Sequence, residues 1–151
     1  MMVKNDKFYM QEALQEAHKA LKKQEVPIGA VVVCEDAIVG RGYNQRETLQ
    51  RSTAHAEVIA IDEACRTLGS WRLEDCTIYV TVEPCPMCAG TIIQSRIKRL
   101  VYAAADNKNG AHVSGINVFN GPFNHTVDID SGVMAEESKE MIQAFFSSLR
   151  K

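Results

Sequence analysis

The stretch TIYVTVEPCPMCAGTIIQSR, residues 77–96, carries the pattern that decides the fold. Its first six residues are all β-branched or aromatic, which predicts a buried strand over Thr77 to Val82. Residues Met87 to Arg96 predict a buried helix, and the apolar run Leu100 to Ala104 predicts the next strand. A strand, a helix and a strand in succession indicate an α/β protein.

The preceding segments add a helix and a hairpin. Phe8 to Lys23 places apolar residues at helical spacing, which predicts an amphipathic helix. Two short β-rich runs, Ala30 to Cys34 and Ala37 to Arg41, flank Glu35-Asp36 and predict a hairpin that turns there.

The remaining segments complete the alternation. Ala56 to Leu68 predicts a helix that ends at Gly69. The Gly- and Asn-rich residues 106–124 predict loops with a little regular structure, and Val127 to Asp130 predicts a short strand. Glu136 to Arg150 predicts a final helix, whose expected apolar face consists of Met141, Ile142, Phe145, Phe146 and Leu149. We therefore expect one domain over residues 1–151, a three-layer α/β/α sandwich with a mixed central sheet.

Composition narrows the function classes. Of the 151 residues, 46% are apolar and 24% charged, with a net charge of −2, which excludes intrinsic disorder. The net charge argues weakly against a highly basic nucleic-acid binder but leaves room for a local basic patch. No apolar run is long enough to span a membrane, and the polar residues 1–7 give no secretory signal. The five cysteines, an odd number, favour reduced or metal-bound thiols, and we expect a cytoplasmic location.

The sharpest chemical pattern combines His55-Ala56-Glu57 with Pro84-Cys85-Pro86-Met87-Cys88. Zinc prefers imidazole and thiolate ligands, and a catalytic zinc keeps three protein ligands and one open position. His55, Cys85 and Cys88 supply three such ligands, each close to an expected helix start. Glu57 lies close by and is suited to carry a proton from a water that the metal activates.

Other interpretations of these residues stay open. A C-x-x-C pair alone also fits a redox pair or half of a structural zinc site, although neither a thioredoxin-like context nor a second C-x-x-C is present. The remaining cysteines and histidines are expected to be core, surface or loop residues: Cys34, Cys65, Cys76, His18, His112 and His125.

The H-x-E and P-C-x-x-C motifs resemble those of the zinc-dependent nucleobase and nucleoside deaminases. Further segments look like those of bacterial tRNA-specific adenosine deaminases, and together they span nearly the whole chain. They are residues 25–31, 44–48, 54–57, 69–73, 83–90, 95–97, 123–125 and 145–146.

This resemblance implies a cytidine-deaminase-like fold, a homodimer with one Zn²⁺ per subunit, and deamination of the wobble adenosine of a tRNA anticodon, with arginine tRNA the expected substrate. It assigns the metal to His55, Cys85 and Cys88 and proton transfer to Glu57. The base would meet Asn44, Ala56, Val26, Pro27 and Pro84, and the RNA groove would include Lys108, Asn124 and Phe146. Candidate phosphate contacts are Arg96, Lys98, Arg99 and Lys108.

Three alternatives remain. A deaminase of a free base or nucleoside would share the catalytic residues but enclose a small ligand. A catalytically inactive subunit could bind RNA without turnover, although an intact Glu57 argues against it. A redox protein built on Cys85 and Cys88 is the third.

Overall fold

The computed structural model describes residues 4–150. The elements in chain order are α1 (Asp6–Lys22), β1 (Gly29–Cys34), β2 (Ala37–Tyr43), α2 (Arg46–Leu49), α3 (Ala56–Leu68), β3 (Cys76–Val82), α4 (Pro86–Gln94), β4 (Arg99–Ala104), the 3₁₀ helix η1 (Val118–Asn120), β5 (Asp128–Ser131) and α5 (Ala135–Leu149). These bounds match the predicted segments closely, and α2 and η1 are additions that the sequence analysis did not foresee. Across residues 4–150, no helix has both the length and the apolar character needed to cross a bilayer.

The five strands form one mixed sheet in the order β2-β1-β3-β4-β5. Strand β1 is antiparallel to both β2 and β3, whereas β3, β4 and β5 run parallel to one another. The predicted hairpin is confirmed, and its turn residues Glu35 and Asp36 have φ angles of 50° and 64°. Positive φ at both central residues is typical of the tight turn that matches the twist of two paired strands.

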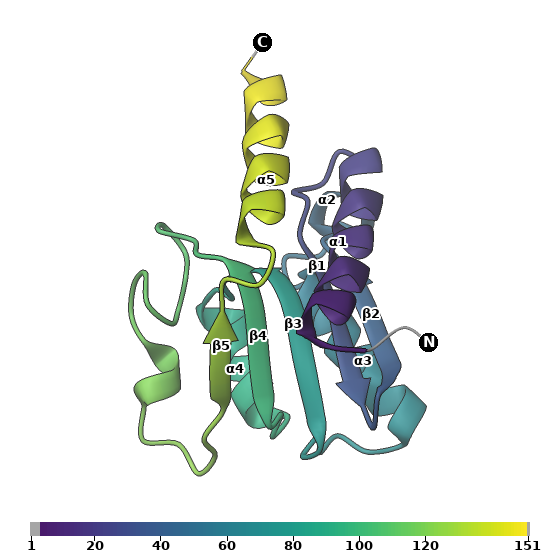
Figure 1. Cartoon of the computed structure of the whole chain (residues 1–151), viewed down its shortest axis with the longest axis vertical. Coiled ribbons are helices and arrows are strands. Elements are labelled where there is room, and N and C mark those ends of the chain that lie inside the picture. Colours follow the sequence, from purple (N-terminus) through teal and green to yellow (C-terminus); the bar gives the residue numbers. More distant parts are fainter. Residues whose placement is uncertain (1–3, 151) are drawn as a thin grey trace.

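Helices cover both faces of the sheet, with α1 on one face and α3 and α4 on the other (Figure 1). Met10 and Ala13 of α1 pack against Val31 and Val101. On the opposite face, residues of α3 and α4 pack in a larger cluster that includes Ile78 and Leu100. The predicted three-layer sandwich with a mixed sheet is therefore confirmed.

Helix α5 begins near the end of β4 and extends well beyond the sheet (Figure 1). The predicted final helix is present, and the five residues of its predicted apolar face are buried only in part. Phe145 is buried and Met141 and Ile142 are half-buried, but Phe146 and Leu149 are 42% and 62% exposed. The last turns lie past the edge of the sheet, so no layer lies beneath them to cover these side chains.

The strand directions bring four chain segments to the same edge of the sheet. Strands β2, β3 and β4 end at this edge and β1 begins there, because β1 is antiparallel to its two neighbours. The segments that follow or precede these ends are residues 26–28, 44–45, 83–85 and 105–108. Half of the twelve predicted site residues therefore converge at this edge through topology alone.

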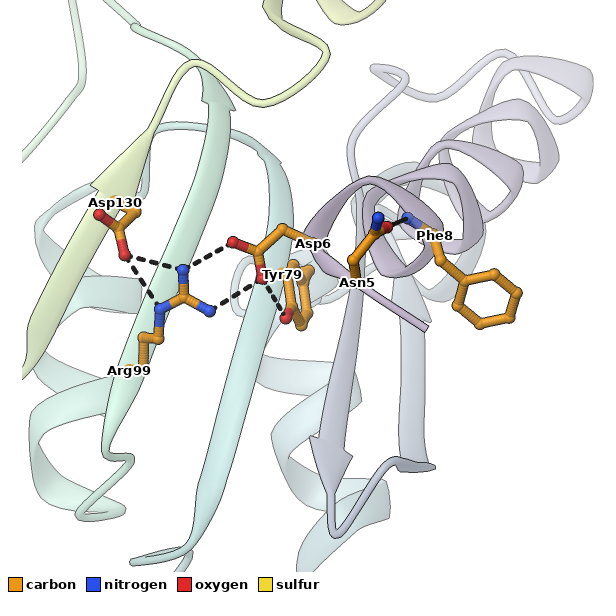
Figure 2. A network of polar contacts seen from close by, with 6 residues as sticks. All are labelled: Asn5, Asp6, Phe8, Tyr79, Arg99 and Asp130. Carbon is orange, nitrogen blue, oxygen red and sulfur yellow. Dashed lines mark hydrogen bonds and ion pairs between the residues drawn. The ribbon is translucent and has the colours of Figure 1, made fainter. Parts of the chain in front are cut away.

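A polar network ties the first helix to the far strands (Figure 2). Arg99 of β4 donates two hydrogen bonds to Asp6 at 2.7 and 2.8 Å and two to Asp130 of β5 at 2.8 and 3.0 Å. The hydroxyl of Tyr79 also donates to Asp6, at 2.7 Å, and Asn5 caps α1 by accepting from the backbone N–H of Phe8. The guanidinium of Arg99 is thus occupied by two carboxylates, and its role as a candidate phosphate contact stays a prediction.

We predict that Arg99→Met lowers the free energy of unfolding by about 1–2 kcal/mol at neutral pH, a range reduced because the network is partly open to solvent. Hydrogen bonding to Arg99 holds the pKa of Asp6 below its ordinary value. This contribution is complete above the pKa that Asp6 has in the unfolded chain, about 4, and is lost as Asp6 becomes protonated at lower pH.

Urea unfolding at neutral pH and at about pH 3 measures both effects, with Arg72→Met as the matched control. Arg72 forms a single exposed ion pair with Glu74 at 3.7 Å, so its replacement should change stability by less than about 0.5 kcal/mol. An Arg99→Met deficit that is the same at both pH values would contradict the assignment to Asp6.

Candidate active site

Two helix starts present the predicted metal ligands. His55 and Cys85 each occupy the position before the first helical residue, of α3 and α4 respectively, and neither uses its side chain to cap its helix. Pro86 is the first residue of α4, where its missing N–H costs no helical hydrogen bond. Both side chains are therefore free to face a common point, and Cys88 joins them from the first turn of α4.

The three ligand atoms are spaced as a tetrahedral metal requires. The Nδ1 atom of His55 lies 3.7 Å from Cys85 Sγ and 3.5 Å from Cys88 Sγ. All three atoms lie within 4.8 Å of one another. Zinc bonds of about 2.3 Å to sulfur and about 2.0 Å to nitrogen, at tetrahedral angles, would place N and S about 3.6 Å apart. The site thus fits a metal ion held by three protein ligands.

The charges of these ligands also suit a cation. A hydrogen bond from Cys88, followed by one from His55, lowers the pKa of Cys85 to about 4, so this sulfur is a thiolate at neutral pH. The hydrogen bond with Cys85 in turn raises the pKa of His55, and that of Cys88 is raised as well. His55 and Cys88 thus hold protons that are hydrogen-bonded to the Cys85 thiolate. A bound cation would replace those protons.

Glu57 lies in the first turn of α3, two residues after His55, and only 4% of its surface is exposed. Burial raises the pKa of its carboxyl to about 7. A group with a pKa near neutrality can accept and return a proton with similar ease. The fold therefore places a buried carboxyl with a pKa near neutrality beside the ligand cluster.

Asn44 joins the end of β2 to the start of α3. Its Oδ1 accepts a hydrogen bond of 2.9 Å from the backbone N–H of Ala56, the first residue of α3. This bond satisfies a helix N–H that His55 leaves uncapped, and it leaves the Asn44 amide N–H groups for another partner. The same bond engages the Ala56 N–H, and the expected contact between the base and the backbone around Ala56 stays a prediction.

The other predicted residues fall into two groups. Val26, Pro27 and Pro84 lie at the same sheet edge, directly beside β1 and β3. Lys108 is exposed on a loop that touches this edge, because Ala111 of that loop donates a 2.8 Å hydrogen bond to the Pro84 carbonyl. The exposed residues Asn124 and Phe146 lie in a more distant loop and near the far end of α5, outside the ligand cluster.

Two buried carboxylates beside the site escaped the sequence analysis. Glu25, 3% exposed, accepts hydrogen bonds from the backbone N–H groups of Glu47 and Thr48 at the start of α2. Glu83, also 3% exposed, accepts four backbone N–H bonds from residues of the 106–114 loop. Glu25 precedes Pro27 and the start of β1, and Glu83 follows β3 and precedes Pro84. An acidic residue beside a proline and a buried strand is a sequence signal that could have revealed both.

Comparison with known proteins agrees with this geometry. A family model described as MafB19-like deaminase matches residues 4–150. A tRNA-specific adenosine deaminase of Bacillus subtilis (strain 168) is 52% identical over 147 residues, which cover 97% of this chain and 91% of the relative.

Two solved structures of deaminases are similar to this chain in fold and sequence. A structure from a study of A-to-I editing by tRNA:A34 deaminases at the wobble position of transfer RNA has a TM-score of 0.86 and 45% identity. The match covers 88% of this chain and 97% of that one. A guanine deaminase from Bacillus subtilis is 32% identical with a TM-score of 0.66, covering 95% of each chain. The fold is thus the cytidine-deaminase-like fold that the resemblance implied.

We predict that Cys88→Ser abolishes stable metal binding, because the hydroxyl replaces a buried thiolate ligand. The loss should exceed the about 10- to 100-fold cost of removing an outer partner of a metal ligand. Metal content per chain, measured by plasma mass spectrometry after dialysis, tests this. Cys65→Ser, which changes a half-buried cysteine outside the cluster, is the control and should keep its metal. Equal metal content in both variants would refute the ligand assignment.

Proposed function

Because the chain belongs to the family of tRNA-specific adenosine deaminases, we propose that it hydrolyses adenosine to inosine at the wobble position of a tRNA anticodon, with Zn²⁺ as its metal and arginine tRNA as a substrate. One observation carries the proposal: the cluster of His55, Cys85 and Cys88 stands beside the buried carboxylate of Glu57. This arrangement combines a metal site with a proton carrier, which hydrolytic deamination requires.

The metal, when bound, would lower the pKa of water toward neutrality. Glu57 would accept the proton of the water that attacks C6 of adenine and pass it to the ring nitrogen N1. It would then help the C6 amino group leave as ammonia, so that C6 exchanges its bond to nitrogen for one to oxygen. A pKa near 7 suits both directions of transfer.

The other site residues would bind the base and the RNA. The free amide N–H groups of Asn44 would hydrogen-bond the base, while Val26, Pro27, Ala56 and Pro84 would form the walls of its pocket. Extracting a base from a single-stranded loop costs little unstacking energy, which makes an anticodon loop a suitable substrate.

Outside the pocket, Lys108 would meet a phosphate, and Asn124 and Phe146 would extend the RNA-binding groove. A homodimer and a cytoplasmic location remain predictions, and light scattering of the purified protein would test the first.

We predict that Glu57→Gln retains its metal but loses about 10²- to 10⁴-fold in turnover, the usual contribution of general acid–base catalysis. Glutamine keeps the size of the side chain but cannot exchange the proton. Glu63→Gln, on the same helix but outside the ligand cluster, is the matched control and should turn over normally. A Glu57→Gln enzyme that remains active with its metal bound would exclude Glu57 as the proton carrier.

We predict conversion of wobble adenosine to inosine in a transcribed arginine tRNA, read as a change from A to G after reverse transcription. The same tRNA with guanosine at the wobble position is the control for site selection. Free adenosine, guanine and cytidine form parallel arms, because a guanine deaminase also has this fold. Activity on a free base or nucleoside alone would preserve the metal chemistry but overturn the RNA substrate.

A further inference from the structure

The loop of residues 106–114 is folded around a single buried carboxylate. Glu83 Oε1 accepts from the backbone N–H of Asp106 at 3.1 Å and from the Ser114 hydroxyl. Its Oε2 accepts from the N–H groups of His112, Val113 and Ser114 at 2.9, 3.0 and 3.2 Å. Apart from Ala111, the loop has few buried apolar side chains, so these bonds form its interior.

The loop lies directly against the metal-binding segment. Glu83 comes two residues before Cys85, and the carbonyl of the intervening Pro84 accepts a hydrogen bond from Ala111. A second anchor joins His112 Nδ1 to the Tyr102 hydroxyl of β4 at 2.8 Å. The loop is thus fixed at the same sheet edge as the ligand cluster.

The position of Lys108 depends on this carboxylate through Asp106. Asp106 Oδ1 accepts from the N–H groups of Lys108 and Asn109, both at 3.1 Å, and forms a tight turn. The N–H of Asp106 is itself held by Glu83. A change at Glu83 would therefore release the turn that carries Lys108.

Gly110 shows how closely the loop packs on Glu83. A Cβ atom at this position would overlap the Glu83 carboxyl carbon and the Asp106 carbonyl oxygen. The glycine is needed here for close approach. A methyl group at residue 110 would displace the loop while leaving the carboxylate intact.

We propose that Glu83 is a positioning residue for RNA binding, which holds the 106–114 loop and its Lys108 in the shape that receives the anticodon loop. This inference rests on the proposed function. Two residues that follow β3 then have different roles. Cys85 would bind the metal, whereas Glu83, two residues earlier, would hold the loop that contacts the substrate. Its effect should appear in KM for RNA and not in metal content.

The test compares Glu83→Gln and Gly110→Ala with the wild-type enzyme on an anticodon stem-loop. Glutamine replaces one carboxylate oxygen by an NH₂ group, which donates and cannot accept. If this group takes the place of Oε1, it faces the N–H of Asp106, so that hydrogen bond is lost. Loss of such a hydrogen bond corresponds to about a tenfold change in an equilibrium constant. We expect KM to rise about tenfold in both variants, with kcat and bound metal little changed.

Amide hydrogen exchange supplies a readout that is independent of turnover. Exchange at Asp106 should accelerate in Glu83→Gln, because its N–H loses its acceptor. Exchange at His112, Val113 and Ser114 should accelerate in Gly110→Ala, because the added methyl group moves the loop away from the carboxylate. Glu16→Gln and Gly90→Ala are the matched controls: Glu16 is a buried carboxylate paired with Arg41 and Lys19, and a Cβ at Gly90 meets no atom within 4 Å. Both should keep the wild-type KM and exchange pattern.

Unchanged KM, a fall in kcat alone, loss of metal, or wild-type exchange in the loop would each overturn the proposal. If Glu83→Gln does not fold, Gly110→Ala decides the question, because it retains the carboxylate. A wild-type enzyme that fails to deaminate the stem-loop would instead refute the proposed function. The exchange data would then still report whether Glu83 orders the loop.

Discussion

The close contact between α3 and β2 is the constraint on which the site depends. A Cβ at Gly40 or Gly42 would overlap the backbone of α3, at the carbonyls of Ala60 and Ala56 respectively. Glycine on the strand and alanine on the helix therefore let the two backbones nearly touch, and such close-packed contacts tolerate little displacement. The start of α3 is fixed relative to the end of β2, which brings Asn44 within hydrogen-bonding distance of Ala56.

With α3 fixed in this way, two short motifs on two helices can form one site. His55 and Glu57 are placed by α3, while Cys85 and Cys88 are placed by α4, and both helices lie on the same face of the sheet. Their N-termini favour negative charge, which suits the Cys85 thiolate and the metal site that it helps to form. Around this rigid centre, the loops are held by buried carboxylates, with Glu25 on one side and Glu83 on the other.

The sequence predicted what is encoded locally and missed what depends on distant partners. Periodicity located the main strands and helices, and the spacing of His55, Cys85 and Cys88 identified ligands that the structure brings together. The four-residue helix α2 shows no periodicity and is capped by Glu25, far from it in sequence. The sequence pattern also could not reveal that α5 extends beyond the edge of the sheet, or that the partners of Arg99 are Asp6 and Asp130. The roles assigned to the base- and RNA-binding residues stay predictions.

The bridge from Asp6 through Arg99 to Asp130 joins residues that leave the ribosome at very different times. Helix α1 is synthesised first, yet Asp6 cannot be neutralised until Arg99 has emerged, and the bridge is complete only when Asp130 follows. The apolar side of α1, by contrast, packs mainly on β1, including Val31 and Val33, which follow it directly in the sequence. Because contacts between residues close in sequence form early, α1 can pack on the β1–β2 hairpin before β4 and β5 are made, and the bridge forms last. The last strands to be synthesised therefore add an ion-pair network to a helix that already has an apolar surface to pack on.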